Sequence, residues 1–214
     1  FILLPPSLGR GGAITALTIR GQVAFAGLGI AFMMLEMPLI QSFVLFLGHP
    51  LASLAVTLLT ILTFSGVGSF LSQRWPTERL VGRIRLAILV ITLLALLYNF
   101  LLPFLFKALA GWPLWGRALL SFLAMAPLGL AMGVPLPSGI RLAQRSCPQS
   151  IPWMWATNCA MSVLGSVLAV FLAMVVGFRL TMAFGVMAYI LVAFALGPIF
   201  LRAPDDPPQP AASP

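Results

Sequence analysis

Glu36 is the residue in this sequence best placed to do chemistry, because it stands inside an almost wholly apolar stretch, residues 33–50. A carboxylate at the centre of a membrane helix costs about 2.5–3.5 kcal/mol even on translocon-based scales. The side chain must therefore protonate, pair with another group or face a wet cavity. Pro38 lacks an amide hydrogen and is expected to kink the helix between Glu36 and Gln41. This combination predicts a polar midplane site of the kind that transporters use for small cations.

The same carboxyl group also has a purely structural interpretation. Buried polar side chains commonly hold membrane helices together through hydrogen bonds. Asn158, inside a later apolar stretch, is the partner that the sequence offers for Glu36. We favour this structural interpretation and keep Glu36, Gln41 and Asn158 as the candidate polar residues inside the membrane. It predicts that Glu36 faces protein rather than lipid and forms a hydrogen bond there.

The remaining reactive residue types predict neither a catalytic site nor a bound cofactor. His49 and the nearby methionines would offer ligands to a haem, but a lone histidine in a Gly-His-Pro turn is more simply a turn residue. Cys147 and Cys159 lack metal-ligand spacing, and Cys159 is expected to be buried and inert. The sequence holds no Ser/His/Asp or Cys/His set and no phosphate-binding loop. We therefore predict no catalytic residue, no metal site and no cofactor.

The composition indicates the class of protein. Charged residues make up 7% of the chain and hydrophobic residues 61%, and the mean hydropathy is +1.08. A soluble domain carries about 25% charged residues, so we expect an integral membrane protein in contact with the lipid bilayer. The net charge of +8 does not indicate nucleic-acid binding, because the basic residues flank apolar stretches instead of forming a patch.

Apolar stretches of membrane-spanning length recur along the chain. The predicted fold is an all-α, polytopic membrane bundle of about six transmembrane helices, the first one kinked near Pro38. Residues 1–20 are predicted to be a linker, 21–202 the membrane domain and 203–214 a disordered, proline-rich tail. Because the chain begins with Phe1 and has no signal sequence, we expect it to be part of a longer product. The predicted spans are residues 22–47, 51–72, 84–106, 118–134, 153–176 and 180–201.

The distribution of basic residues predicts the orientation. With six spans, both ends of the chain lie on one side, which then holds nine of the 12 Lys and Arg residues. The positive-inside rule places that side in the cytoplasm. The three basic residues on the other side are Lys107, Arg117 and Arg179.

Two further patterns concern helix packing. A short helix from Ser138 to Arg145 is expected to lie at the membrane interface with Ser138 as its cap, which makes Arg141 an interfacial anchor or, alternatively, a substrate contact. Small residues four positions apart, such as Gly129 and Gly133, predict closely packed helices and a surface suited to a partner.

Three stretches, residues 27–72, 127–142 and 151–179, resemble the membrane-embedded half of bacterial spermidine synthase-like multi-pass membrane proteins. The resemblance implies a cytoplasmic aminopropyltransferase-like domain beside a multi-pass segment of the inner membrane. This sequence lacks the glycine-rich loop and acidic residues of that domain, so we do not predict aminopropyl transfer for these residues. The motifs that carry the resemblance are Glu-x-x-x-x-Gln at Glu36 and Gln41, Leu-Gly-His-Pro around His49, Ser-Gly-x-Gly-Ser at 65–69, and Pro-x-Pro-x-Gly-x-Arg at Pro135, Pro137 and Arg141.

Two functions are therefore expected. The first is a non-catalytic membrane module that anchors or scaffolds a larger assembly, with a soluble aminopropyltransferase-like domain, other membrane subunits or further copies of itself as partners. The second is a transporter or channel-like module for a polyamine or another small cation, with its polar site at Glu36.

Overall fold

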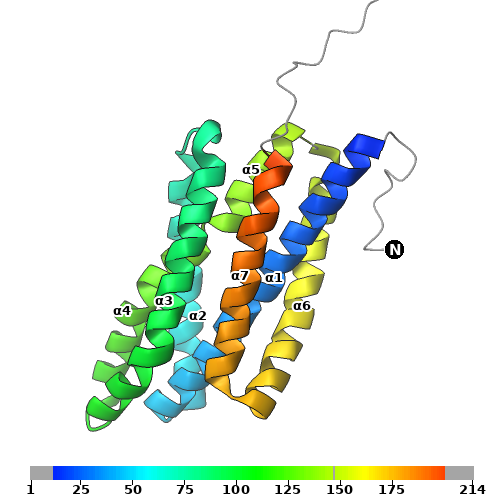
Figure 1. The fold of residues 1–214 in the computed structure, drawn as a ribbon. Helices are drawn as coiled ribbons and strands as arrows, with labels where there is room; N and C mark the ends of the chain where they lie inside the picture. Colours follow the sequence, from blue (N-terminus) through cyan, green and yellow to red (C-terminus); the bar gives the residue numbers. More distant parts are fainter. Residues whose placement is uncertain (1–11, 147, 201–214) are drawn as a thin grey trace, which may run out of the picture.

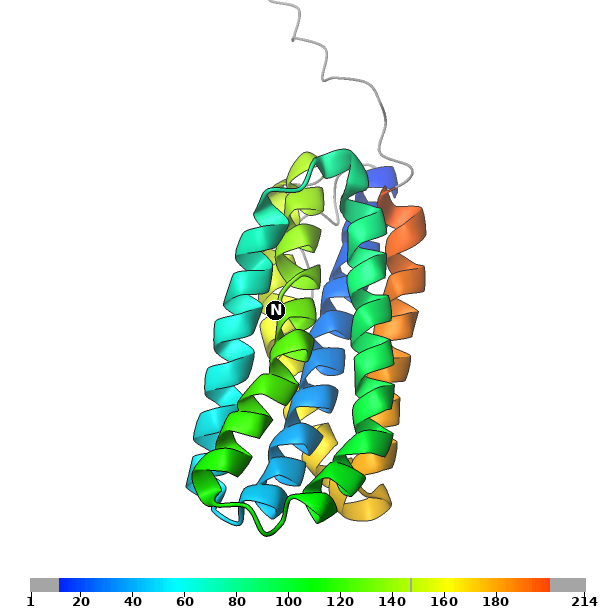
Figure 2. The same ribbon diagram turned by 90° about the vertical axis from the view of Figure 1, so that its left-hand side faces the viewer.

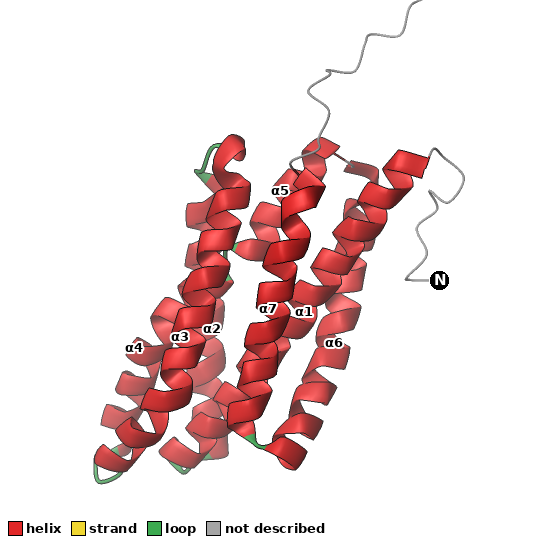
Figure 3. Cartoon of the chain, viewed as in Figure 1, coloured by secondary structure: helices red, strands yellow, loops and turns green. Residues whose placement is uncertain are grey.

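The computed structural model describes residues 12–146 and 148–200, which form helices joined by short loops, without a β-strand (Figures 1 and 3). Within this part of the chain, six helical segments are long and apolar enough to cross a membrane. The predicted all-α membrane bundle is thereby confirmed. The elements are α1 (Gly12–Leu47), α2 (Pro50–Gln73), η1 (Thr77–Arg79), α3 (Leu80–Ala108), α4 (Leu114–Met132), α5 (Pro135–Ser146), η2 (Pro148–Ser150), α6 (Ile151–Val176) and α7 (Phe178–Phe200).

Two of the connections are tight turns built on glycine. Gly48 follows α1 with a φ of +73°, and Gly177 follows α6 with a φ of +85°. A residue without a Cβ reaches this left-handed backbone at little cost. Pro50 then starts α2, at a helix position where its missing N–H removes no hydrogen bond. Both turns lie at the end of the bundle opposite to the start of α1 (Figure 1).

The centre of the bundle is α1. It packs most extensively against α6 and α7, while α2 pairs with α4, and α3 packs against α7 (Figures 1 and 2). Leu35, Leu39 and Phe43 of α1 are fully buried. Pro38 lies inside α1 without ending it. The helix that carries Glu36 is therefore the most covered of the six spans.

The outer surface of the bundle is apolar. Large side chains such as Leu59 of α2 and Leu164 and Phe171 of α6 are exposed, and these two helices are the least covered spans. A soluble protein rarely exposes so large a contiguous apolar surface to water. This surface instead suits contact with lipid acyl chains. Trp112 and Trp115 are exposed near the α3–α4 connection, as is typical of the membrane–water interface.

The first helix begins earlier in the chain than predicted. Helix α1 begins at Gly12, so the predicted linker, residues 1–20, is wrong for its second half. The other spans begin and end within a few residues of the predicted bounds, except the fourth. Residues 1–11, Cys147 and the predicted proline-rich tail lie outside the described residues.

The predicted interfacial helix differs most from the structure. Helix α5 begins at Pro135, and Ser138 lies inside it with a fully buried side chain, so Ser138 is not its cap. Instead of lying flat, α5 continues from α4 toward the end of the bundle where α1 begins (Figure 2). It packs among α1, α2 and α3, because Leu142 and Ala143 give it an apolar side to bury. The fourth span thus consists of two helices, α4 and α5.

Helices α2 and α4 approach one another at the level of the backbone. A Cβ atom added to Gly133 would overlap the carbonyl group of Ser65, and one added to Gly68 would overlap the carbonyl oxygen of Leu130. The predicted small-residue face of Gly129 and Gly133 is therefore used for packing within the chain. It is not left as a surface for a partner.

Candidate functional site

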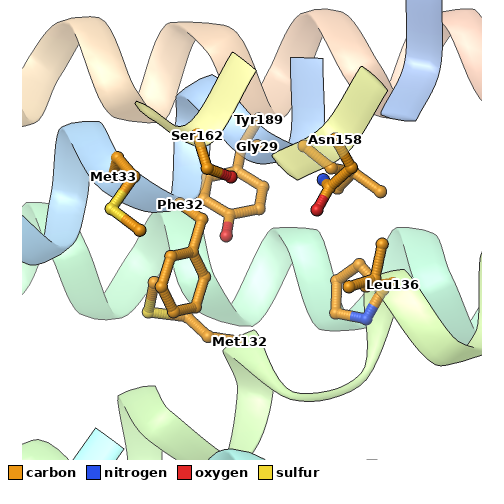
Figure 4. Close-up of a pocket in the computed structure, with 10 residues that line it drawn as sticks. Gly29, Phe32, Met33, Met132, Leu136, Asn158, Ser162 and Tyr189 are labelled. Atoms are coloured by element: carbon orange, nitrogen blue, oxygen red, sulfur yellow. The ribbon is translucent and has the colours of Figure 1, made fainter. Parts of the chain in front are cut away.

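A cavity of about 200 Å³ lies where the break between α4 and α5 faces α1, α6 and α7 (Figure 4). Residues from the middle turns of α1 and α7 line part of it, and its walls are mostly apolar. Membrane transporters place their substrates beside such broken helices, so this cavity is the candidate functional site. Its lining residues are Leu28, Gly29, Phe32, Met33, Met132, Pro135, Leu136, Asn158, Ser162 and Tyr189.

Pro135 and Pro137 explain why the fourth span breaks here. Neither proline has an N–H group, so neither continues the hydrogen-bond ladder from α4 into α5. The N–H of Val134 bonds to the carbonyl of Ala131, and that of Ser138 to Val134. Few N–H donors therefore remain at the start of α5. A helix N-terminus ordinarily attracts anions through such donors, so this one is poorly suited to an anionic ligand.

Three polar side chains reach the cavity. Asn158 donates a 2.9 Å hydrogen bond from Nδ2 to the backbone carbonyl of Phe25, which ties α6 to α1. The carbonyl oxygen of the Asn158 side chain, the hydroxyl of Ser162 and the hydroxyl of Tyr189 point toward the space between the helices (Figure 4). Apart from these groups the lining is apolar and includes the thioether side chains of Met33 and Met132, which suits a small ligand with one polar end.

Glu36 lies one helical turn beyond Met33, outside the lining of the cavity. Its side chain is only 4% exposed, so it is enclosed by protein. The expected hydrogen bond with Asn158 is not formed, because Asn158 bonds to Phe25. None of the side-chain hydrogen bonds found among the described residues involves Glu36. The carboxyl group of Glu36 is therefore buried without a hydrogen bond to any of the described residues.

Gln41 does not join this site. Its side chain is half-buried, and its Oε1 atom is buried without a hydrogen-bond partner among the described residues. Gln41 is also absent from the cavity lining. The structure therefore brings only Asn158, of the three candidate intramembrane residues, to the cavity wall.

His49 and Cys159 lie away from the cavity. His49 is exposed in the α1–α2 turn, and the described residues contain no group of three or more His, Cys, Asp or Glu side chains able to hold a metal ion. Cys159 is exposed on the outer face of α6, so the prediction that it is buried is wrong. The periodicity of α6 directs neighbouring Asn158 inward and therefore turns Cys159 outward.

Arg141 has a defined structural role. Its two terminal nitrogens donate to the carbonyl oxygens of Ser72, at 2.9 Å, and Trp75, at 3.0 Å. The Ser72 carbonyl lies in the last turn of α2 and the Trp75 carbonyl just beyond it, where a cation also interacts favourably with the helix dipole. Arg141 thus ties α5 to α2 instead of serving as a free interfacial anchor.

Arg117 is the structurally important residue that the sequence interpretation missed. Its Nη1 donates a 2.7 Å hydrogen bond to the carbonyl of Phe46 in the last turn of α1. Its guanidinium also lies 5.9 Å from the centre of the Phe46 ring, which stacks on Phe106 of α3. In the sequence Arg117 counted only toward the orientation, because nothing in its neighbourhood indicates contact with a helix 71 positions away.

These features define a multi-pass α-helical membrane protein with a discontinuous fourth span and a small, mainly apolar cavity beside the break. No protein-family model, curated protein or solved structure matches this chain. The resemblance to spermidine synthase-like membrane proteins therefore stays a prediction.

Proposed function

We propose that this chain is a non-catalytic integral membrane module that anchors or scaffolds a larger assembly. The observation that carries the proposal is the use of its interior polar side chains. Tyr98, Arg117, Arg141 and Asn158 each donate a hydrogen bond to a backbone carbonyl of a different helix or its connecting loop. Such bonds hold helices at defined positions. Helices held at fixed positions in this way suit a rigid support better than a transporter, in which helices must move.

The partners we propose are a soluble aminopropyltransferase-like domain, as the resemblance implies, or other membrane subunits, including further copies of this chain. The small-residue face of α4 is occupied by α2 and does not supply the contact. The least covered spans, α2 and α6, offer the most accessible surface for a membrane partner.

If a membrane partner binds α6, a bulky substitution on the outer face of that helix should weaken the assembly. We expect the chain to purify from mild detergent as an oligomer or together with other membrane polypeptides. A Val167→Trp substitution, which adds bulk to an exposed position of α6, should shift the particle toward a smaller mass. Light scattering coupled to size-exclusion chromatography measures this mass.

The matched control is Leu93→Trp, which adds bulk to an exposed position of α3 and should leave the mass unchanged. A wild-type chain that is a partner-free monomer in mild detergent would count against the scaffold proposal. Equal effects of both substitutions would show that α6 is not the contact surface.

We further propose that the chain lies in the bacterial inner membrane with both termini in the cytoplasm. Helix α1 begins, and α7 ends, at the same end of the bundle as the α2–α3 loop (Figure 1). That loop and the first two turns of α3 together carry four arginines, Arg74, Arg79, Arg83 and Arg85, which supports this orientation. A reporter fused after Arg85 should therefore read as cytoplasmic, and one fused at Pro113 as periplasmic. The reversed pattern would contradict the orientation.

A second candidate function is a transporter or channel-like module for a polyamine or another small cation. The observation that favours it is the cavity at the broken fourth span, with the buried carboxyl of Glu36 one helical turn from the lining residue Met33. Carbonyl, amide and hydroxyl oxygens around this space are ligands suited to a cation. A flux measurement on variants of Glu36, described in the Discussion, separates this function from the scaffold.

A further inference from the structure

A larger groove, of about 440 Å³, runs between α3 and α7 on the outside of the bundle. Its walls are mainly apolar, with Leu89 of α3 facing Ile190 and Phe194 of α7. Leu89 and Phe194 are exposed, so the groove is open to the surroundings of the protein. In a membrane this surface contacts lipid rather than water.

The polar end of this groove is formed by Arg85. This residue is exposed in the second turn of α3, near the end of the bundle that carries the α2–α3 loop. Arg83, two positions earlier, lies 4.8 Å from the centre of the Trp75 ring. Arg85 itself has no ion pair, hydrogen bond or aromatic partner among the described residues. Its charge is therefore free to meet a ligand.

A second polar group lies deeper in the same groove. Thr92 follows Arg85 by two helical turns, or about 10 Å along the helix axis. Its hydroxyl oxygen is buried without a hydrogen-bond partner among the described residues. Because this oxygen is not accessible from the groove, the lining at this depth acts as an apolar wall.

We propose that this groove binds one anionic phospholipid. The guanidinium of Arg85 meets the phosphate, and one acyl chain lies along Leu89, Ile190 and Phe194. A free phosphate ion would gain nothing from the apolar walls and would have only one cation. A phospholipid matches both the charge at the mouth and the hydrocarbon below it.

Native mass spectrometry tests the proposal on the whole chain, purified in mild detergent and mixed with palmitoyl-oleoyl phosphatidylglycerol or phosphatidylcholine. The wild-type chain should retain one phosphatidylglycerol more strongly than phosphatidylcholine. An Arg85→Gln substitution should weaken phosphatidylglycerol retention by about five-fold, the effect of one basic residue near a charged surface. The matched control is Arg79→Gln, at an exposed arginine outside the groove, which should bind like the wild type.

An Ala193→Trp substitution tests the acyl-chain part independently of charge. Ala193 lines the groove, so a large ring there should displace both lipids while Arg85 stays in place. Retention of phosphatidylglycerol by Arg85→Gln or Ala193→Trp at the wild-type level would overturn the proposal. Equal losses in Arg85→Gln and Arg79→Gln would replace it with diffuse electrostatic attraction, and competition by millimolar inorganic phosphate would point to a free-phosphate site.

Discussion

A Gly133→Ala variant should lose about 3 kcal/mol or more in free energy of unfolding, the upper end of the range for overpacked positions. The added methyl group overlaps the backbone carbonyl of Ser65 in α2. Backbone cannot move aside as the end of a flexible side chain can, so α2 and α4 must separate. Unfolding by increasing sodium dodecyl sulfate in mixed micelles, followed by tryptophan fluorescence, measures the loss.

The chain offers a matched control for this prediction in α2 itself. A Cβ atom added to Gly66 has no other atom within 4 Å. Gly66→Ala should therefore be neutral or stabilising by up to about 1 kcal/mol, because alanine favours a helix over glycine. Gly68→Ala, two positions further along α2, should resemble Gly133→Ala. If Gly133→Ala proved as stable as Gly66→Ala, the close contact between α2 and α4 would be wrong.

A Glu36→Met variant should be more stable than the wild-type chain, by about 2–3 kcal/mol. The acid is buried and forms no hydrogen bond with the described residues, so its placement costs about what an acid costs at a membrane centre. Methionine has a similar size and shape and does not carry that cost. Steric trapping or detergent-induced unfolding measures the difference, and Glu78→Met, at an exposed position of the short helix η1, should change stability by less than about 0.5 kcal/mol.

The same position separates the two proposed functions. Glu36→Gln keeps the size of the side chain but removes the ability to carry a negative charge. In proteoliposomes, a transporter should lose its flux of protons, potassium or methylammonium in this variant while the protein stays folded. A scaffold should keep its assembly mass unchanged. A clear loss of stability in both Glu36→Met and Glu36→Gln would instead mean that the carboxyl group makes a stabilising interaction.

Much of the fold could be predicted because membrane helices follow local rules. An apolar stretch of sufficient length has to be helical in lipid, since only a helix satisfies its own backbone within one segment. The spans that start at Pro50 and Ile151 therefore match the prediction closely. The turns at Gly48 and Gly177 are likewise local, because each depends on the conformational freedom of one residue.

The candidate site could be predicted only in part. The sequence singled out Glu36, Gln41 and Asn158, yet helical periodicity does not say which neighbour each will face. Asn158 reaches the cavity but bonds to Phe25, and Gln41 lies away from the lining. Tyr189 and Ser162, which complete the polar wall, carry no signal in the sequence, since tyrosine and serine are ordinary residues of membrane helices.

The sequence by itself determined that this is a membrane protein with helical spans, because hydropathy and backbone hydrogen bonding depend only on composition and local order. The tertiary structure decided how the polar residues are used. Arg117 and Arg141 bond to carbonyls 71 and 66–69 positions away, and Glu36 is enclosed by helices that only the fold brings together. The sequence predicted a span that ends at residue 134 and a new helix from Ser138, but whether that helix lies on the membrane surface or enters the bundle depends on the space left by α1, α2 and α3. That space exists only in the folded chain.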